Sequence, residues 1–132
     1  MKNHPIFLTV AEIIEFHDLE IISAGGASGI RDMHGLESAV GAPKATFAGV
    51  HLMPLFEMAA TYINSIAFTH PFVDGNKRTA LASALTFLYL NGFEIEEDYD
   101  EELADIMLDL LAKKISKDDL AEHLKIKSKS IA

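Results

Sequence analysis

The feature that most constrains the fold is a pair of apolar segments, residues 54–69 and 77–90, that a short loop separates. Pro54 suits the first turn of a helix, where its missing N–H group is not needed. Apolar residues recur at helical spacing in the first segment, whereas the second segment is apolar on nearly every side and therefore has to be central. Together they predict a buried helical hairpin at the middle of the fold.

Shorter segments on both sides of this hairpin predict helices that cover it. Thr9 and Glu12 have the spacing of a capping box at the start of a helix over 10–23, and a glycine-rich loop follows that helix. Because no run alternates convincingly with period two, we expect an all-α fold of about six helices. The remaining expected elements are a helix over 35–40, a short extended piece over 93–95, a helix that Asp100 caps and that reaches about Lys113, and a last helix that Ser116 starts, with Asp119 three residues on, and that reaches about Leu124.

The chain length of 132 residues fits one domain, so we expect a single domain over 1–132 with a frayed tail over about 125–132. The first residues lack the long apolar run of a secretion signal, and the longest apolar-looking stretch is too short to cross a bilayer. A cytoplasmic protein with no membrane partner is the expectation. The absence of cysteine excludes a disulfide framework, a thiolate zinc site and a cysteine nucleophile.

The charge pattern points to an anionic ligand. The formal net charge of −9 argues against non-specific binding to nucleic acid, so no direct nucleic-acid partner is expected. Between Ala45 and Ala112 the only basic residues are the neighbours Lys77 and Arg78. An isolated cationic pair in an acidic region indicates a specific anion that binds there.

The stretch HPFVDGNKRTA, residues 70–80, carries groups that handle phosphate. The helix that follows the loop presents unpaired N–H groups and the positive end of its dipole at its first turn. Gly75 lets a ligand approach the backbone closely. Lys77 and Arg78 stand in that first turn, where the dipole disfavours cations unless an anion is bound. This local conflict predicts a phosphate site.

Two further residues of this stretch suit phosphoryl chemistry. Asp74 offers the oxygen ligands of a hard cation, and one carboxylate together with nucleotide phosphates is a usual arrangement for Mg²⁺. His70 is the natural general base, because a neutral imidazole can take a hydroxyl proton near pH 7. Each residue alone has a structural interpretation, such as a helix cap or a turn. Their combination within one loop favours a functional site over the structural interpretation.

These residues resemble the signature of the Fic/Doc superfamily, and the ending NKRTA is similar to that of its Doc (death on curing) branch. The Fic branch typically has a second glycine where this chain has Lys77, and a final arginine where it has Leu81. Weaker landmarks in the expected order extend the resemblance over most of the chain. These landmarks are Glu15–Asp18, Gly25–Asp32, Leu36–Ala39 and Asn91–Gly92.

The resemblance implies a small all-helical toxin of a toxin–antitoxin module. Doc proteins transfer the γ-phosphate of ATP to a threonine of elongation factor Tu and so arrest translation. By this resemblance His70 is the base and Asp74 holds Mg²⁺, and Phe72 anchors the loop in the core. The groups that bind the ATP phosphates are Gly75, Asn76, Lys77 and Arg78.

The departures from the Fic pattern favour the kinase but leave two alternatives. The final Fic arginine helps to hold the nucleotide for adenylylation, and apolar Leu81 cannot replace its fork of donors. A Fic-like adenylyltransferase is the first alternative, and a non-catalytic nucleotide- or partner-binding module is the second. The chain also lacks the inhibitory Ser/Thr-x-x-x-Glu-Gly/Asn element of the superfamily. The resemblance therefore implies a small Phd-like antitoxin as a partner that supplies the restraint in trans.

Three features outside the loop have simpler interpretations. The glycine-rich run over 25–29 lacks a preceding strand and the Lys-Ser/Thr ending of a Walker sequence, so a structural turn is expected. His17 is expected to be buried and hydrogen-bonded rather than a metal ligand. Arg31 is a secondary candidate that either pairs locally with Asp32 or faces the site.

Overall fold

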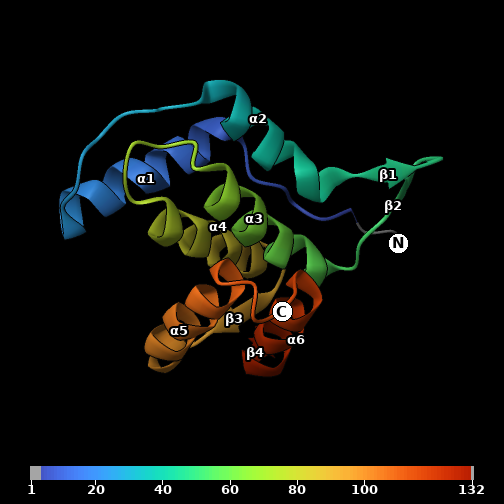
Figure 1. Cartoon of the computed structure of the whole chain (residues 1–132). Coiled ribbons are helices and arrows are strands. Elements are labelled where there is room, and N and C mark those ends of the chain that lie inside the picture. The colour runs from blue at the N-terminus through green and yellow to red at the C-terminus, as the bar shows by residue number, and fades with distance from the viewer. Residues whose placement is uncertain (1–3, 132) are drawn as a thin grey trace.

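The two apolar segments form the central helices α3 (Leu55–Thr69) and α4 (Asn76–Leu90), which pack along each other. Helices α1 (Val10–Ala24) and α2 (Met33–Gly41) cover one side of this pair, with α1 against α4 and α2 against α3. Helices α5 (Asp100–Leu111) and α6 (Lys117–Lys127) cover the opposite side, as Figure 1 shows. The computed structural model describes residues 4–131, and within them the expected all-α fold with six α-helices around a central hairpin is confirmed.

Side-chain caps set the starts of three helices. At α1 the Glu12 N–H donates to Thr9 Oγ1 at 3.1 Å and the Thr9 N–H donates to Glu12 Oε1 at 2.8 Å, so the expected capping box is present. Helix α2 begins at Met33, two residues earlier than expected, because the Asp32 carboxylate accepts the Gly35 N–H at 2.8 Å. Ser116 caps α6 as expected, with a second capping box.

Helix α5 differs slightly from its expected span. Asp100 is its first helical residue rather than its cap, since the short 3₁₀ helix η2 (Glu97–Tyr99) leads directly into it. The helix ends at Leu111 instead of about Lys113, and Lys113 has a positive φ of 60°. That left-handed turn redirects the chain toward α6.

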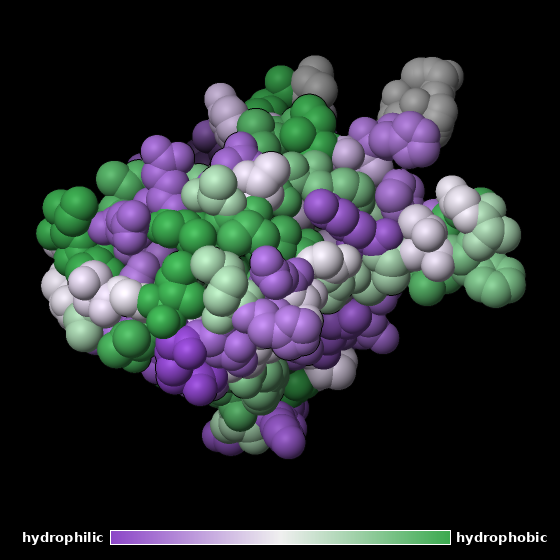
Figure 2. Space-filling view, turned by 90° about the horizontal axis from the view of Figure 1, so that it is seen from above, coloured by the Kyte–Doolittle hydropathy of each residue, from purple (hydrophilic) through white to green (hydrophobic). Residues whose placement is uncertain are grey.

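A small β-hairpin between α2 and α3 was not expected. After the 3₁₀ helix η1 (Ala42–Lys44), strands β1 (Thr46–Phe47) and β2 (Val50–His51) pair antiparallel across a turn in which Ala48 and Gly49 both have positive φ. Figure 2 shows the hairpin projecting from the side of the molecule as a mainly white and green extension. Its exposed apolar side chains are Phe47, Val50 and Leu52.

The expectation of a frayed tail over 125–132 is wrong for the residues that the structure describes. Helix α6 continues to Lys127, and β4 (Ser128–Ser130) pairs antiparallel with β3 (Phe93–Ile95), the extended piece expected from the sequence. The Lys127 Nζ lies 2.7 Å from Glu102 Oε2. The backbone of a polar segment is thus ordered by the open edge of β3, and residue 132 lies outside the described part.

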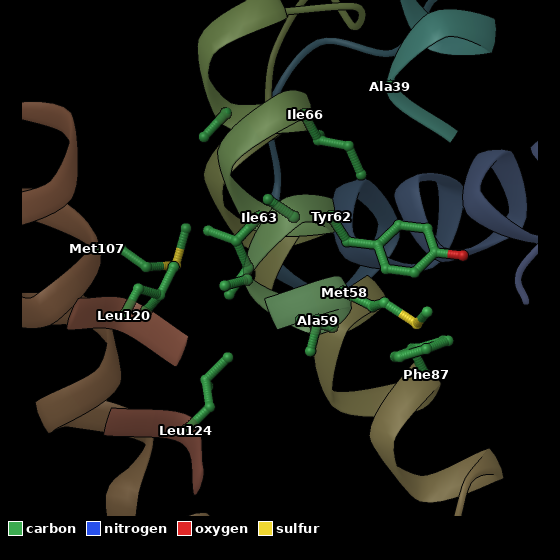
Figure 3. Packing of buried hydrophobic residues seen from close by; sticks show 14 of the residues in the cluster. Ala39, Met58, Ala59, Tyr62, Ile63, Ile66, Phe87, Met107, Leu120 and Leu124 are labelled. Atoms are coloured by element: carbon green, nitrogen blue, oxygen red, sulfur yellow. The ribbon is translucent and has the colours of Figure 1, made fainter. Parts of the chain in front are cut away.

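The core surrounds α3, whose side chains reach both covering layers (Figure 3). Tyr62 and Phe87 pack with their rings tilted by 53° and their centroids 5.1 Å apart, and the Tyr62 hydroxyl accepts the Leu8 N–H at 3.0 Å. Burial raises the pKa of Tyr62 to about 12. On the other side Leu120 and Leu124 of α6 are fully buried. Since both faces of α3 are buried, the loop at its C-terminal end rests on a rigid support.

Candidate functional site

The loop between α3 and α4 presents His70 to solvent. His70 ends α3 in the left-handed conformation (φ 53°, ψ 56°), and its N–H donates to Ile66 O at 3.2 Å. A left-handed residue at this position turns the chain sharply away from the helix axis. The imidazole is exposed and lines a pocket of about 450 Å³. The other residues around that pocket are Val73, Asp74, Gly75, Asn76, Lys77, Arg78 and Leu111.

Asn76 holds the loop in its shape. Its Oδ1 accepts the Phe72 N–H at 3.0 Å, and its Nδ2 donates to Phe72 O at 3.0 Å. Phe72 is 1% exposed, which confirms that it anchors the loop in the core. The side chain of Asn76 is therefore occupied within the loop, and the group that it can offer to an anion is its backbone N–H.

The first turn of α4 lines the pocket and is a candidate anion site. Gly75 precedes it in the left-handed conformation (φ 76°), and no side chain caps the N–H groups of that turn. A Cβ atom on Gly75 would lie 3.3 Å from Ile21 Cδ1 and 3.5 Å from Arg78 Nη2. Because uncapped N–H groups and the helix dipole both favour negative charge, this turn can bind a phosphate.

Two cationic side chains belong to this turn. Lys77 is exposed and Arg78 is half-buried, and both line the pocket. Arg78 Nη2 donates to Gly25 O at 3.1 Å, which fixes the guanidinium while leaving most of its donors unused. A guanidinium held in one place is well suited to bind phosphate oxygens.

The Asp74 carboxylate is fixed by two backbone donors. Its Oδ2 accepts the Ala27 N–H at 3.2 Å and its Oδ1 accepts the Gly75 N–H at 2.8 Å. These hydrogen bonds, with a smaller contribution from Arg78, lower the pKa of Asp74 below its ordinary value of 3.8. The carboxylate thus stays ionised near neutral pH. Gly26 leaves room for it, since a Cβ there would lie 2.7 Å from Asp74 Oδ2.

Asp74 fits a cation that is shared with a nucleotide. Within the described residues, no cluster of three or more His, Cys, Asp or Glu side chains could hold a metal ion. A single ionised carboxylate beside an anion site is nevertheless the donor set that Mg²⁺ uses when phosphates complete its coordination. The residues present therefore suit Mg²⁺ bound together with phosphate.

The segment after α1 holds the loop from the other side. Arg31 Nε donates to His70 O at 2.7 Å and Arg31 Nη2 donates to Thr69 O at 2.9 Å, so this secondary candidate caps the end of α3. The Arg31 N–H bonds to Pro71 O at 2.7 Å and the Val73 N–H bonds to Gly29 O at 3.0 Å. The glycine-rich run is an irregular segment that packs against the loop.

Comparison with known proteins identifies the family of this chain. A family model described as "Fic/DOC family" matches residues 7–88, which include the loop and nearly all of both central helices. The chain belongs to the Fic/DOC family.

Two named relatives of this family member are Doc proteins. "Toxin Doc" of Mycolicibacterium smegmatis is 41% identical over 105 residues, which cover 78% of this chain and 81% of the relative. "Protein kinase doc" of Escherichia phage P1 is 39% identical over 114 residues, which cover 86% of this chain and 89% of the relative.

Several residues of the Fic/DOC site could not be found from the local motif. Leu111 reaches the pocket from the end of α5, and Ala27 supplies a backbone donor to Asp74 that no side-chain pattern reveals. His17 is 1% exposed, and its Nε2 lies 2.7 Å from Asp74 O, which confirms the expectation of a buried, hydrogen-bonded histidine.

None of the helices described in the structure is sufficiently long and apolar to span a membrane.

Proposed function

We propose that this chain is the toxin of a toxin–antitoxin pair and a protein kinase that transfers the γ-phosphate of ATP to a threonine hydroxyl of elongation factor Tu. The names of the two relatives, "Toxin Doc" and "Protein kinase doc", support this assignment at 41% and 39% identity. The observation that carries it is that exposed His70 and the uncapped first turn of α4 line one and the same pocket.

The nucleotide phosphates would bind at the start of α4. The first turn offers its uncapped backbone N–H groups, and the two cationic residues Lys77 and Arg78 line the same pocket. In phosphoryl transfer most of the catalysis comes from positioning and from neutralising charge on the phosphate oxygens. Fixed donors in the pocket serve both needs, since they need no reorganisation during the reaction.

His70 would act as the general base. The threonine hydroxyl oxygen forms a bond to the γ-phosphorus, the bond from that phosphorus to the bridging oxygen breaks, and ADP leaves with the bond electrons. The hydroxyl proton passes to the His70 imidazole, which is exposed at the pocket and accessible to a protein substrate. Arg31 holds the His70 carbonyl and so fixes the point from which the imidazole projects.

Asp74 would hold the magnesium ion that accompanies ATP. When bound, Mg²⁺ neutralises charge on the phosphate oxygens. The contribution of the chain is an ionised carboxylate that two backbone N–H groups hold in one orientation.

Leu81 supports phosphorylation over adenylylation. Together with Met107 and Leu108 of α5 it lines an apolar hollow of about 200 Å³ beside Lys77 and Arg78. An arginine at this position would offer a second fork of donors to the nucleotide phosphates, and leucine offers none. The cations available to the nucleotide are therefore those of the first turn of α4.

The cellular role follows from the same proposal. Phosphorylation of elongation factor Tu would arrest translation in the cytoplasm, and a small Phd-like antitoxin would restrain the enzyme. Exposed apolar residues near the loop, such as Val73 and Ile30, are consistent with a partner that covers the site.

The decisive experiment uses purified protein, Mg²⁺ and elongation factor Tu, with ATP labelled at either the γ- or the α-phosphorus. Label transferred only from the γ-position is the expected result. Transfer from the α-position would instead make the protein an adenylyltransferase. Binding of ATP without transfer to elongation factor Tu or to any protein of a cell lysate would favour a non-catalytic binding module.

A further inference from the structure

We infer that His17 is a positioning residue for the cation-binding carboxylate, because it fixes the backbone of Asp74 from α1. This inference rests on the proposed function of the pocket as a site for Mg²⁺ and ATP. His17 does not line the pocket, so it would act through Asp74 and not on the nucleotide itself.

The first observation is a hydrogen bond inside the molecule. His17 Nε2 lies 2.7 Å from the Asp74 carbonyl oxygen, although 57 positions separate the two residues in the chain. Since a carbonyl oxygen can only accept, Nε2 has to carry the hydrogen, which determines the tautomer of a neutral ring. His17 is 1% exposed and the bond is part-buried, so water has little access to the donor.

The second observation is a stacking contact on the same ring. The imidazole of His17 lies parallel to the phenyl ring of Phe72, with 3.9 Å between centroids and 6° between planes. The Asn76 side chain also forms two hydrogen bonds with the backbone of Phe72. One buried side chain of α1 therefore contacts the loop at two points, at Phe72 through its face and at Asp74 through its edge.

The third observation is the location of the other contacts of Asp74. Its carboxylate is held by the N–H groups of Ala27 and Gly75, in bonds that are exposed to water. The bond from His17 is part-buried and so better shielded than these two, and it holds the main chain from which the carboxylate projects. Loss of this bond should let the carboxylate move relative to the first turn of α4. Groups that orient a metal ligand in this way typically contribute 10–100-fold to metal affinity.

Two substitutions of His17 separate the contribution of its hydrogen bond to Asp74 from the contribution of its stacking on Phe72. His17→Phe keeps an aromatic ring against Phe72 and removes the donor to Asp74. His17→Gln keeps an N–H donor of similar reach and removes the ring. His34→Phe is the matched control, because His34 is an exposed histidine on α2.

Calorimetry would measure ATP binding twice, with Mg²⁺ and with a chelator in its place. For His17→Phe we expect the affinity for ATP with Mg²⁺ to fall by about tenfold, and the affinity for ATP alone to change by less than about twofold. His17→Gln should recover most of the magnesium-dependent affinity, and His34→Phe should behave as the parent protein. If the role of His17 is purely structural, the affinity for ATP should fall equally with and without Mg²⁺, in step with the melting temperature of the variant. That result would overturn the inference.

A second measurement needs no nucleotide and so stays informative if the proposed function fails. In ¹⁵N NMR spectra the His17 ring should show a hydrogen on Nε2, and the amide signals of Ala27 and Gly75 should shift in His17→Phe but much less in His17→Gln. Unchanged amide signals in His17→Phe would show that Asp74 keeps its place without His17. Absence of ATP binding by the parent protein, with the amide shifts present, would reject the proposed function alone.

Discussion

The side chain of Asn76 forms a closed pair with the backbone of Phe72, accepting from its N–H and donating to its carbonyl oxygen, each at 3.0 Å. Both groups are buried, so the pair is shielded from water. It ties the first turn of α4 back onto the loop and keeps Gly75 at the tip. The loop geometry thus depends on one amide that does not itself face the ligand.

Replacement of Asn76 should therefore affect stability as well as ligand binding. Asn76→Ala leaves both buried backbone groups of Phe72 without a partner and should lower the free energy of unfolding by about 2–4 kcal/mol. Asn76→Asp keeps the acceptor for the Phe72 N–H but sets a carboxylate oxygen against Phe72 O, so it should also lose stability at neutral pH. Urea denaturation measures both values. An Asn76→Ala variant as stable as the parent would contradict the structural role of this pair.

Gly25 and Gly26 provide a matched test of the space around Asp74. Both have positive φ, so alanine should cost about 1 kcal/mol of stability at either position. Only at Gly26 would the new Cβ meet the Asp74 carboxylate, at 2.7 Å, whereas nothing lies within 4 Å at Gly25. Gly26→Ala should therefore weaken Mg²⁺-dependent ATP binding several-fold more than Gly25→Ala. Equal effects in calorimetry would show that this close approach is unimportant.

His70 can be removed with little effect on ATP affinity. Asparagine tolerates the left-handed conformation of this residue, so His70→Asn is preferable to His70→Ala, and both should reduce phosphoryl transfer by about 10²–10⁴-fold. Toxicity to growing cells should be lost with the activity. The dissociation constant for ATP should stay within about twofold, because the proposed site for the phosphates is the start of α4. Transfer at the parent rate by His70→Asn would exclude His70 as the base.

The two cations should affect binding more than His70 does. Lys77→Ala and Arg78→Ala each remove a charged donor beside the phosphate site and should weaken ATP binding by about tenfold or more. Lys129→Ala is the control, since that lysine pairs with Glu96 on the β3–β4 sheet. In titrations at increasing salt concentration, the ATP affinities of Lys77→Ala and Arg78→Ala should come closer to that of the parent protein. Equal binding by all three variants would place the phosphates elsewhere.

The titration of Asp74 gives a prediction for pH. The N–H groups of Ala27 and Gly75 lower the pKa of this carboxyl in the folded chain below its ordinary value of 3.8. The stabilising contacts of the carboxylate are therefore fully present at any pH above 3.8. They are lost as the pH falls through the lower folded-state value. The carboxyl ¹³C signal of Asp74 should therefore titrate below 3.8, and the Ala27 amide signal should move with it. A midpoint at or above 3.8 would contradict these contacts.

The central hairpin could be predicted, and the polar residues of its loop could be singled out, because their signals are local. Helical periodicity, the capping residues and the cluster from His70 to Arg78 all lie within short stretches of sequence. The expectation for Asn76 was less accurate in detail. Its side chain, assigned to the phosphates by resemblance, turns inward to Phe72 and leaves its backbone N–H for the site.

The features that escaped prediction depend on distant partners. The polar segment Ser128–Ser130 forms a strand only because β3 offers it an edge, and β1 and β2 are too short to show alternation. The turn of their hairpin uses Ala48 and Gly49 instead of the usual Asn-Gly or Asp-Gly pair. Likewise Arg31 and Ala27 reach the site across long separations, through bonds to or from the backbone.

The position of α6 in the core has a consequence for the timing of activity in the cell. A ribosome releases the loop and both central helices well before α6, yet α6 supplies Leu120 and Leu124 that complete the packing around α3. Since a domain folds as a unit once its core residues are available, the nascent chain carries the residues of the candidate site without a finished support. Any activity of this site therefore has to wait until α6 has been made and has packed against α3.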